Sequence, residues 1–253
     1  MRIAAVAMNT FREAVRDKVL YVLLFFAGAT ILGSKALGWV SVGQDEKIII
    51  DISLAATSLF GVLIAVFVGT SLVYKEIDKR TIYTILSRPM WRYEFVLGKY
   101  LGLAMLIGVV TLVMAAMAAA YIAVMGGHVG LTYLQAVLLI YCQLLLVTAL
   151  SVLLSSLTSP ILGAMIVFSC YVLGHATGIM INMPPRFDGT FVKSAFETAY
   201  YVIPNLSHFN IRAEAANGAT VPGTYVLWTM AYGAAYTALL LVLAAFSFEN
   251  KDV

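Results

Sequence analysis

Residues able to do chemistry gather in one stretch, YKEIDKRTIYTILSRPMWRYEFVLGKY, which runs from Tyr74 to Tyr100. It holds nine of the charged residues of a chain with 16 basic and 13 acidic residues in 253. The sequence has no GxxxxGK(S/T), HExxH or CxxC motif, and Gly98–Lys99 lacks the preceding glycine of a phosphate loop. We therefore expect no enzyme activity and no bound ATP or other cofactor from this chain by itself. Charge at this density instead suggests an interface.

Sulfur-containing residues could in principle bind a soft metal, but their spacing favours packing. Cys142 and Cys170 are solitary within apolar segments, which predicts packed thiols and neither a disulfide nor a metal site. Methionine pairs such as Met114 and Met117 recur at helical spacing, as core side chains do. No metal site is predicted.

The composition is that of an integral membrane protein. Hydrophobic residues make up 62% of the chain and charged residues 11%, with a mean hydropathy of +0.93. From Tyr100 to Pro185 no Asp, Glu, Lys or Arg occurs, so this run cannot form a water-soluble surface. The length of the chain therefore indicates how many membrane spans it can form, and not how many soluble domains.

An apolar helix needs about 20 residues to cross the hydrocarbon core of a bilayer. Breaking the chain at charges and at GGHVG and SSLTSP, two turn-like segments, predicts a single all-α membrane domain over residues 1–253. Its six transmembrane helices are expected over residues 19–40, 52–74, 100–125, 131–156, 161–182 and 224–248.

Two further amphipathic helices are expected outside the spans. Within residues 1–18, apolar side chains from Ile3 to Val15 repeat at helical spacing, which predicts an uncleaved helix lying along the membrane surface. A short disordered tail is the alternative. The loop 183–223 repeats apolar residues in the same way between Phe191 and Ile203, which predicts an interfacial helix ended by Pro204.

The basic residues set the expected orientation. With six spans, 11 Lys and Arg residues fall on the side of both termini and only 5 on the other side. Because basic residues are enriched in cytoplasmic loops, both termini and the loop 75–99 are predicted to be cytoplasmic. The loop 183–223 is then extracytoplasmic.

The cytoplasmic loop 75–99 is expected to form a helix, a break and a second helix. Ser87 can cap the second helix, and Pro89 suits its first turn. Topology alone would account for the basic residues, but not for Glu76 or for the apolar Ile82 and Ile85 outside the membrane. A docking surface for a soluble partner accounts for both.

Polar side chains inside the spans must face protein or water. Gln143, His175 and Asn182 could line a pathway, with Gln135 nearby in sequence, or they could serve as hydrogen bonds between helices. The spacings Gly98-xxx-Gly102 and Gly174-xxx-Gly178 provide small faces at which helices can approach closely, without showing dimerisation.

Three segments resemble the type-2 permease subunits of ATP-binding-cassette transporters: FREAVRDKVLYVLLFFA, IAVFVGTSLVYKEIDKRTIYTILSRPMWRYEFVLGKYLG and YYVIPNLSHFN. The most similar subgroup includes the membrane subunit of nitrous-oxide-reductase maturation transporters, although the group handles unrelated cargo. The resemblance implies a plasma-membrane permease of a bacterium or archaeon, most often an exporter. Its pathway would form between two such chains, identical or paralogous, which meet through the first and fifth spans.

The resemblance also implies separate cytoplasmic ATPase subunits, which would bind ATP and Mg²⁺. A coupling helix in the loop 75–99 would dock on them, and the residues at matching positions are Glu76, Arg80, Thr81, Arg88 and Pro89. Two alternatives remain open: an anchor that passes ATPase-driven motion to an extracytoplasmic partner, and an autonomous channel without any ATPase. Nothing in the sequence suggests a nucleic-acid partner.

Overall fold

The computed structural model describes residues 2–38, 45–78, 92–176 and 203–249, and every element in these ranges is a helix. The all-α part of the predicted fold class is thereby confirmed. The order along the chain is α1 (Arg2–Val15), α2 (Lys18–Gly38), α3 (Asp45–Asp78), α5 (Arg92–Val124), α6 (Leu131–Leu157), α7 (Pro160–His175), the 3₁₀ helix η2 (Leu206–Phe209), α10 (Arg212–Ala216) and α11 (Gly223–Glu249).

Four of these helices are long and apolar enough to cross a membrane. The apolar segments are Asp45–Ser71 in α3, Tyr93–Val124 in α5, Leu131–Leu157 in α6 and Gly223–Ser247 in α11. Within the described residues, α2 and α7 contribute shorter apolar helices, Lys18–Ser34 and Pro160–His175. Six crossings therefore stay a prediction, and residues 177–182 of the expected fifth span lie outside the described residues.

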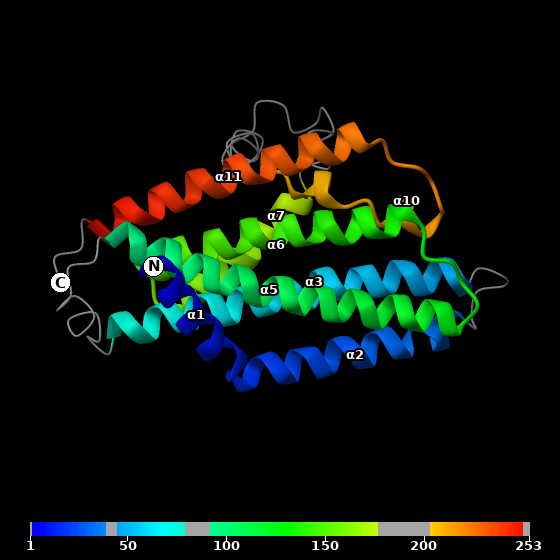
Figure 1. Cartoon of the computed structure of the whole chain (residues 1–253), viewed down its shortest axis with the longest axis horizontal. Coiled ribbons are helices and arrows are strands. Elements are labelled where there is room, and N and C mark those ends of the chain that lie inside the picture. Colours follow the sequence, from blue (N-terminus) through cyan, green and yellow to red (C-terminus); the bar gives the residue numbers. More distant parts are fainter. Residues whose placement is uncertain (1, 39–44, 79–91, 177–202, 250–253) are drawn as a thin grey trace, which may run out of the picture.

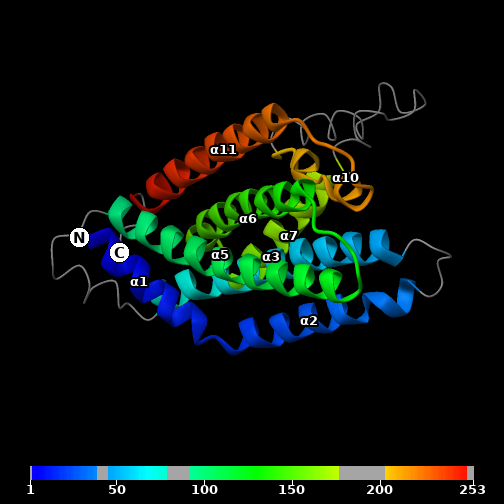
Figure 2. The ribbon, with the colours of Figure 1, turned by 45° about the vertical axis from the view of Figure 1, so that its right-hand side comes forward.

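The long helices run side by side along the longest axis of the molecule (Figures 1 and 2). One end, which we call the α1 end, holds α1, the end of α3 and the start of α5. The opposite end, the α10 end, holds α10, the start of α3 and the connection between α5 and α6. Helices α3, α5 and α6 form the centre, with α2 along one flank and α11 along another.

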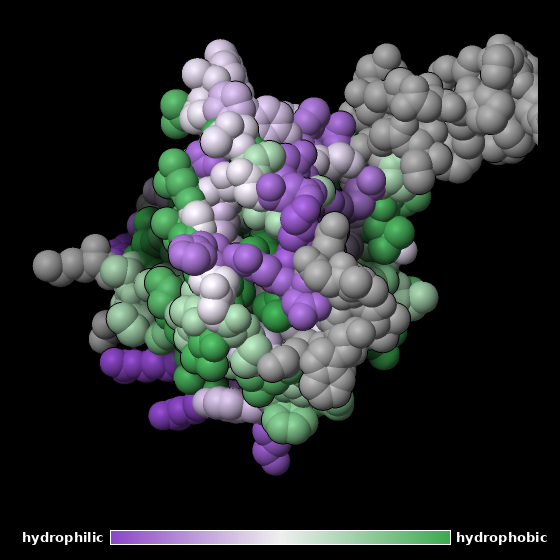
Figure 3. Space-filling model, turned by 90° about the vertical axis from the view of Figure 1, so that its right-hand side faces the viewer, coloured by the Kyte–Doolittle hydropathy of each residue, from purple (hydrophilic) through white to green (hydrophobic). Residues whose placement is uncertain are grey.

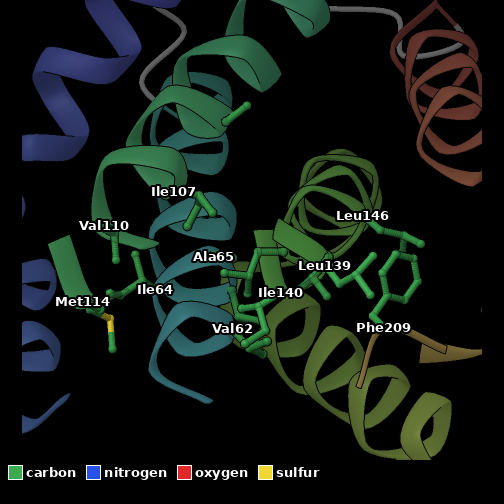
Figure 4. Packing of buried hydrophobic residues seen from close by; sticks show 14 of the residues in the cluster. Val62, Ile64, Ala65, Ile107, Val110, Met114, Leu139, Ile140, Leu146 and Phe209 are labelled. Atoms are coloured by element: carbon green, nitrogen blue, oxygen red, sulfur yellow. The ribbon is translucent and has the colours of Figure 1, made fainter. Parts of the chain in front are cut away.

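Close packing of α3 on α6 depends on two glycines. A Cβ atom added at Gly61 would lie 2.6 Å from Cδ1 of Leu144, and one at Gly69 would lie 3.0 Å from Cβ of Ser151. Helix association in lipid gains little from the hydrophobic effect and relies on such packing. In Figure 4 the side chains of α3 and α6, such as Val62 and Ile140, meet at the centre of this contact.

Buried hydroxyl groups in α3 and α6 are satisfied mainly within their own helices. The Thr57 hydroxyl donates to the carbonyl of Ser53 at 2.8 Å, and Thr148 donates to the carbonyl of Leu144 at 2.7 Å. Such bonds to the preceding turn let Ser and Thr sit in an apolar helix without an orphaned donor. These hydroxyls therefore do not outline a polar pathway.

Both expected turns lie at helix boundaries. Gly126, with φ of 82°, follows α5 in the left-handed region that glycine adopts without strain, and α6 begins at Leu131. The carboxylate of Glu46 accepts a hydrogen bond of 2.8 Å from the backbone N–H of His128 and holds this turn against the start of α3. At the other end of α6, Pro160 begins α7 at a position where its missing N–H costs nothing.

Candidate functional site

The expected coupling residues map to the chain between α3 and α5 at the α1 end. Glu76 lies near the end of α3, which continues past its apolar segment to Asp78. Arg80, Thr81, Arg88 and Pro89 lie outside the described residues. The helix that follows begins at Arg92 and runs without interruption into the apolar part of α5.

Gln143, one of the residues expected to line a pathway, is buried at the centre of α6 with 1% of its surface exposed. It shares a face of α6 with Leu139 and Leu146, which lie against Phe209 in Figure 4. Its side-chain Nε2 has no hydrogen-bond partner within the described part of the chain. A buried amide donor without a hydrogen-bond partner typically costs about 1–3 kcal/mol inside a protein, which makes this position unusual.

His175 is the last residue of α7 and is half-buried. Its Nδ1 lies 3.1 Å from the carbonyl oxygen of Tyr171, and the two rings are 4.6 Å apart between centroids. The Tyr171 hydroxyl in turn shares a hydrogen bond of 3.2 Å with Ser58 of α3. A chain of polar contacts thus joins α3 to the end of α7. Asn182, the third expected residue, lies outside the described residues.

The segment Ile203–Asn210, which contains the PNL sequence, packs on these groups and contacts both α7 and α11. The Ser207 hydroxyl donates to the backbone carbonyl of His175 at 3.1 Å, and the Asn205 N–H donates to the Tyr232 hydroxyl of α11 at 2.9 Å. The side-chain oxygen of Asn205 also accepts a hydrogen bond of 3.0 Å from the Ser207 N–H, which fixes the turn into η2. We call this segment the 203–210 plug.

Apolar side chains hold the plug in place. Phe209 is 1% exposed and sits so close to α11 that a Cβ atom at Gly233 would lie 3.0 Å from its ring. Gly174 of α7 gives similar room to Leu206, whose Cγ would be 2.8 Å from an added Cβ atom. The small residue at position 174 therefore serves a contact with the plug.

Sequence reasoning singled out His175 and Gln143 but missed Tyr171 and Tyr232. Both tyrosines look like ordinary interfacial aromatics in an apolar segment. A signal was present for Tyr232, because Tyr236 follows it four residues later on the same face, and their centroids are 5.3 Å apart. Their polar partners, however, are remote in sequence.

A polar surface covers the α10 end of the molecule. Figure 3 shows hydrophilic side chains crossing this face between hydrophobic ones. A cavity of about 460 Å³ opens there, and its charged or polar lining includes Glu46, Lys47, His128 and Asn217. Glu46 also borders a neighbouring cavity of about 370 Å³. No group of three or more His, Cys, Asp or Glu side chains that could hold a metal ion occurs within the described ranges.

Comparison with curated proteins gives no match for this chain. A family model does match, over residues 39–253, and therefore covers every helix from α3 to α11 together with the 203–210 plug. The family is described only as a protein of unknown function, DUF2705, and the chain belongs to it.

Proposed function

We propose that this chain is the permease subunit of an ATP-binding-cassette transporter that acts as an exporter. Two such chains would form the membrane pathway, and separate cytoplasmic ATPase subunits would bind ATP and Mg²⁺. In this proposal all six apolar helices cross the plasma membrane of a bacterium or archaeon, with the α1 end and both termini in the cytoplasm.

The observation that carries the proposal is the pair of helices that flank residues 79–91. Helix α3 extends past its apolar segment to Asp78, and α5 begins at Arg92 and continues to Val124 without a break. Both belong to the tightly packed centre of the bundle. A force on the charged segment between them would therefore move α3 and α5 and so reach the membrane-spanning core.

The other end of the molecule supports a gated pathway. The 203–210 plug contacts both α7 and α11, and hydrogen bonds at Ser207 and Asn205 hold it in place. Gln143 shares the face of α6 that lies against Phe209 of the plug (Figure 4), and its unpartnered amide could hydrogen-bond a passing molecule once the plug moves. We infer a pathway that closes at the plug and changes as the ATPase binds and hydrolyses ATP.

A second copy would complete the pathway. Outward side chains of the first and fifth apolar helices are well exposed in the single chain, with Phe25 at 72% and Ile161 at 76%. Such side chains would lie against lipid or against the second copy. Cross-linking in native membranes should trap a permease pair through α2 and α7, and the absence of any pair at every cross-linker length would contradict this part of the proposal.

The direct test of the proposal is the composition of the native complex. Purification of the tagged chain in mild detergent should bring down a nucleotide-binding subunit with a GxxxxGK(S/T) loop, which this chain lacks. Recovery of the chain without any ATPase, together with ion conductance by the chain reconstituted alone, would support an autonomous channel and contradict the proposal.

A second candidate, a membrane anchor that passes ATPase-driven motion to an extracytoplasmic partner, is favoured by the polar surface at the α10 end. The cavity lined by Glu46, Lys47 and His128 lies between the ends of α3, α6 and α10 and the connections beside them, where a soluble partner could bind. The two candidates differ in cargo. Flux that follows ATP hydrolysis in vesicles containing only permease and ATPase would support transport, whereas a large copurifying extracytoplasmic protein without flux would support the anchor.

A further inference from the structure

The first helix, α1, packs against the start of α5 more closely than any side chain would allow. A Cβ atom added at Gly102 would lie 2.5 Å from the carbonyl oxygen of Ala7 and 2.6 Å from Cβ of Thr10. At Gly98 an added Cβ atom would lie 2.7 Å from Cβ of Val6. The Gly98-xxx-Gly102 face predicted from the sequence is therefore occupied by a helix of the same chain.

The opposite side of α1 is basic. Ala7, Thr10 and Ala14 are buried, whereas Arg2 and Arg12, on the other side of the helix, are exposed. Arg16 follows in the turn after α1 and is exposed as well. Arg12 and Arg16 form no ion pair within the described part of the chain. Arg12 and Arg16 thus point away from the protein.

An apolar strip lies between the packed side and the basic side of α1. Met8 is 45% exposed, and Phe11 and Val15 are half-buried on the same flank. A helix with one apolar strip beside one cationic strip is the type that lies at the level of lipid headgroups. On α1 this pattern coexists with a third side that is fixed to the protein.

The place at which α1 contacts α5 agrees with a position at the level of the lipid headgroups. Its contact residues, Gly98 and Gly102, lie within the apolar segment Tyr93–Val124, close to the end at which this segment begins. Figures 1 and 2 show α1 crossing this end of the bundle obliquely. The corner between α1 and α2 is fixed by the N-cap of α2, where the Asp17 carboxylate accepts a hydrogen bond from the Val19 N–H at 2.9 Å.

We propose that the basic side of α1, formed by Arg12 and Arg16, binds the headgroups of anionic phospholipids. The arginines supply the positive charge and planar donors that suit phosphate oxygens, and Met8 and Phe11 beside them suit the acyl chains. An acidic soluble protein bound to the same arginines would leave this apolar strip unexplained. Lipid therefore fits the three-sided helix better than a protein partner does.

This binding would set the position of α5. Because backbone and side-chain atoms of α1 leave no room for a Cβ atom at Gly98 or Gly102, a tilt of α1 toward α5 would press on the start of α5. Lipid composition would in this way influence the helix that follows residues 79–91. The lipid proposal itself does not depend on transport and can be tested on the chain alone.

The test is amide hydrogen exchange of the full chain in lipid nanodiscs. Each basic side chain at an anionic surface contributes about fivefold to binding, so exchange in α1 should slow at least about fivefold when phosphatidylglycerol replaces a third of the phosphatidylcholine, on the order of the charge density of bacterial membranes. The double variant Arg12→Gln/Arg16→Gln should lose most of this slowing. Arg12→Lys/Arg16→Lys should keep it, since the charge remains.

Controls separate lipid from other anions and other partners. Lys47→Gln, an exposed basic residue at the α10 end, should leave the lipid effect on α1 unchanged. The proposal is overturned if phosphatidylglycerol has no effect on the parent chain or if the Gln variant responds like the parent. It also fails if inorganic phosphate in pure phosphatidylcholine reproduces the effect. Slowing of α1 exchange only on addition of a soluble ATPase would assign the arginines to a protein interface instead.

Discussion

Gln143 is the residue at which stability and function should separate. The Nε2 atom of Gln143 is buried and has no hydrogen-bond partner within the described residues. Gln143→Leu therefore removes this donor without breaking a hydrogen bond that it makes there. We expect the free energy of unfolding in detergent to stay equal or rise by about 1–3 kcal/mol, because an unpaired buried amide is replaced by an apolar side chain of similar size. ATP hydrolysis stimulated by the permease should fall if the amide serves the pathway.

Gln135 provides the contrast for this experiment. Its Nε2 donates to the backbone carbonyl of Val221 at 3.4 Å, so Gln135→Leu should lower stability slightly. Thermal unfolding of both variants, followed by the fluorescence of the purified chain, makes the comparison. Loss of stability in Gln143→Leu greater than in Gln135→Leu would mean that the Gln143 amide has a structural role.

Tyr232 should hold the 203–210 plug through its hydroxyl. Tyr232→Phe keeps the ring against Phe209 and Tyr236 but deprives the Asn205 N–H of its acceptor at 2.9 Å. Loss of one partner of this partly buried hydrogen bond should cost about 1 kcal/mol, at the low end of the usual range, so amides of the plug should exchange about fivefold faster. Tyr21→Phe, at an exposed position of α2, is the control. Equal exchange in parent and Tyr232→Phe would show that apolar packing alone holds the plug.

At the level of residues, sequence patterns identified unusual side chains but not their partners. A glutamine or histidine inside an apolar segment is conspicuous because burial without a partner is costly. The His175 ring nitrogen finds its contact one turn earlier, at the carbonyl of Tyr171, but the pairing of the His175 carbonyl with Ser207 spans 32 residues and depends on tertiary structure. The coupling residues from Arg80 to Pro89 lie outside the described residues, and their role stays a prediction.

At the level of elements, the α1–α5 contact gives a prediction about stability. Gly102→Ala places a methyl group 2.5 Å from the Ala7 carbonyl oxygen, and overpacking of this kind typically costs about 1–3 kcal/mol. Gly33→Ala in α2 is the matched control, because nothing lies within 4 Å of its added Cβ atom and alanine favours helix by about 0.5–1 kcal/mol.

Thermal unfolding of the two variants should therefore shift in opposite directions. Gly102→Ala should also speed amide exchange in α1 while leaving α10 unchanged, because the clash is local. Equal unfolding temperatures for Gly102→Ala and the parent would mean that α1 yields without cost, and the proposed transmission from α1 to α5 would lose its basis.

The amphipathic pattern of residues 1–18 shows how far sequence reasoning reaches for an element. The helix itself was predicted, and α1 covers Arg2–Val15. Its apolar side required an apolar neighbour, but a pattern of spacing does not distinguish lipid from another helix. Gly98 and Gly102 contained the missing information, since small faces predict close approach, yet they do not name the helix that approaches.

For the whole molecule, orientation is the property most easily tested. In a background with Cys142 and Cys170 replaced by Ala, an impermeant thiol reagent should label Lys47→Cys and His128→Cys on intact cells. Lys79→Cys and Lys251→Cys should react only after permeabilisation, because basic residues remain in the cytoplasm. Labelling of Lys79→Cys from outside would reverse the predicted topology.

The architecture of the whole molecule could be predicted from the sequence as far as it follows from the lengths of the apolar segments. Four long helices appeared where uninterrupted apolar runs require them, and turns fell at GGHVG and SSLTSP. Lengths were less predictable, because α3 begins at Asp45 before the expected Ile52 and extends to Asp78. Polar residues at the ends of a helix can remain helical outside the hydrocarbon, and hydropathy does not detect them.

The central claim is that the segment between α3 and α5 couples an ATPase to the membrane helices. The most direct measurement is permease-stimulated ATP hydrolysis and complex yield for Arg80→Glu and Arg88→Glu, with Lys47→Glu and Lys193→Glu as controls of equal charge change. Reversal at an interface that strands a partner charge typically costs about 2–5 kcal/mol, so the first two variants should insert normally but lose more than about tenfold in assembly. The controls should behave like the parent. If Arg80→Glu and Arg88→Glu assemble and hydrolyse ATP as the parent does, the segment is only a topology signal and the coupling claim is contradicted.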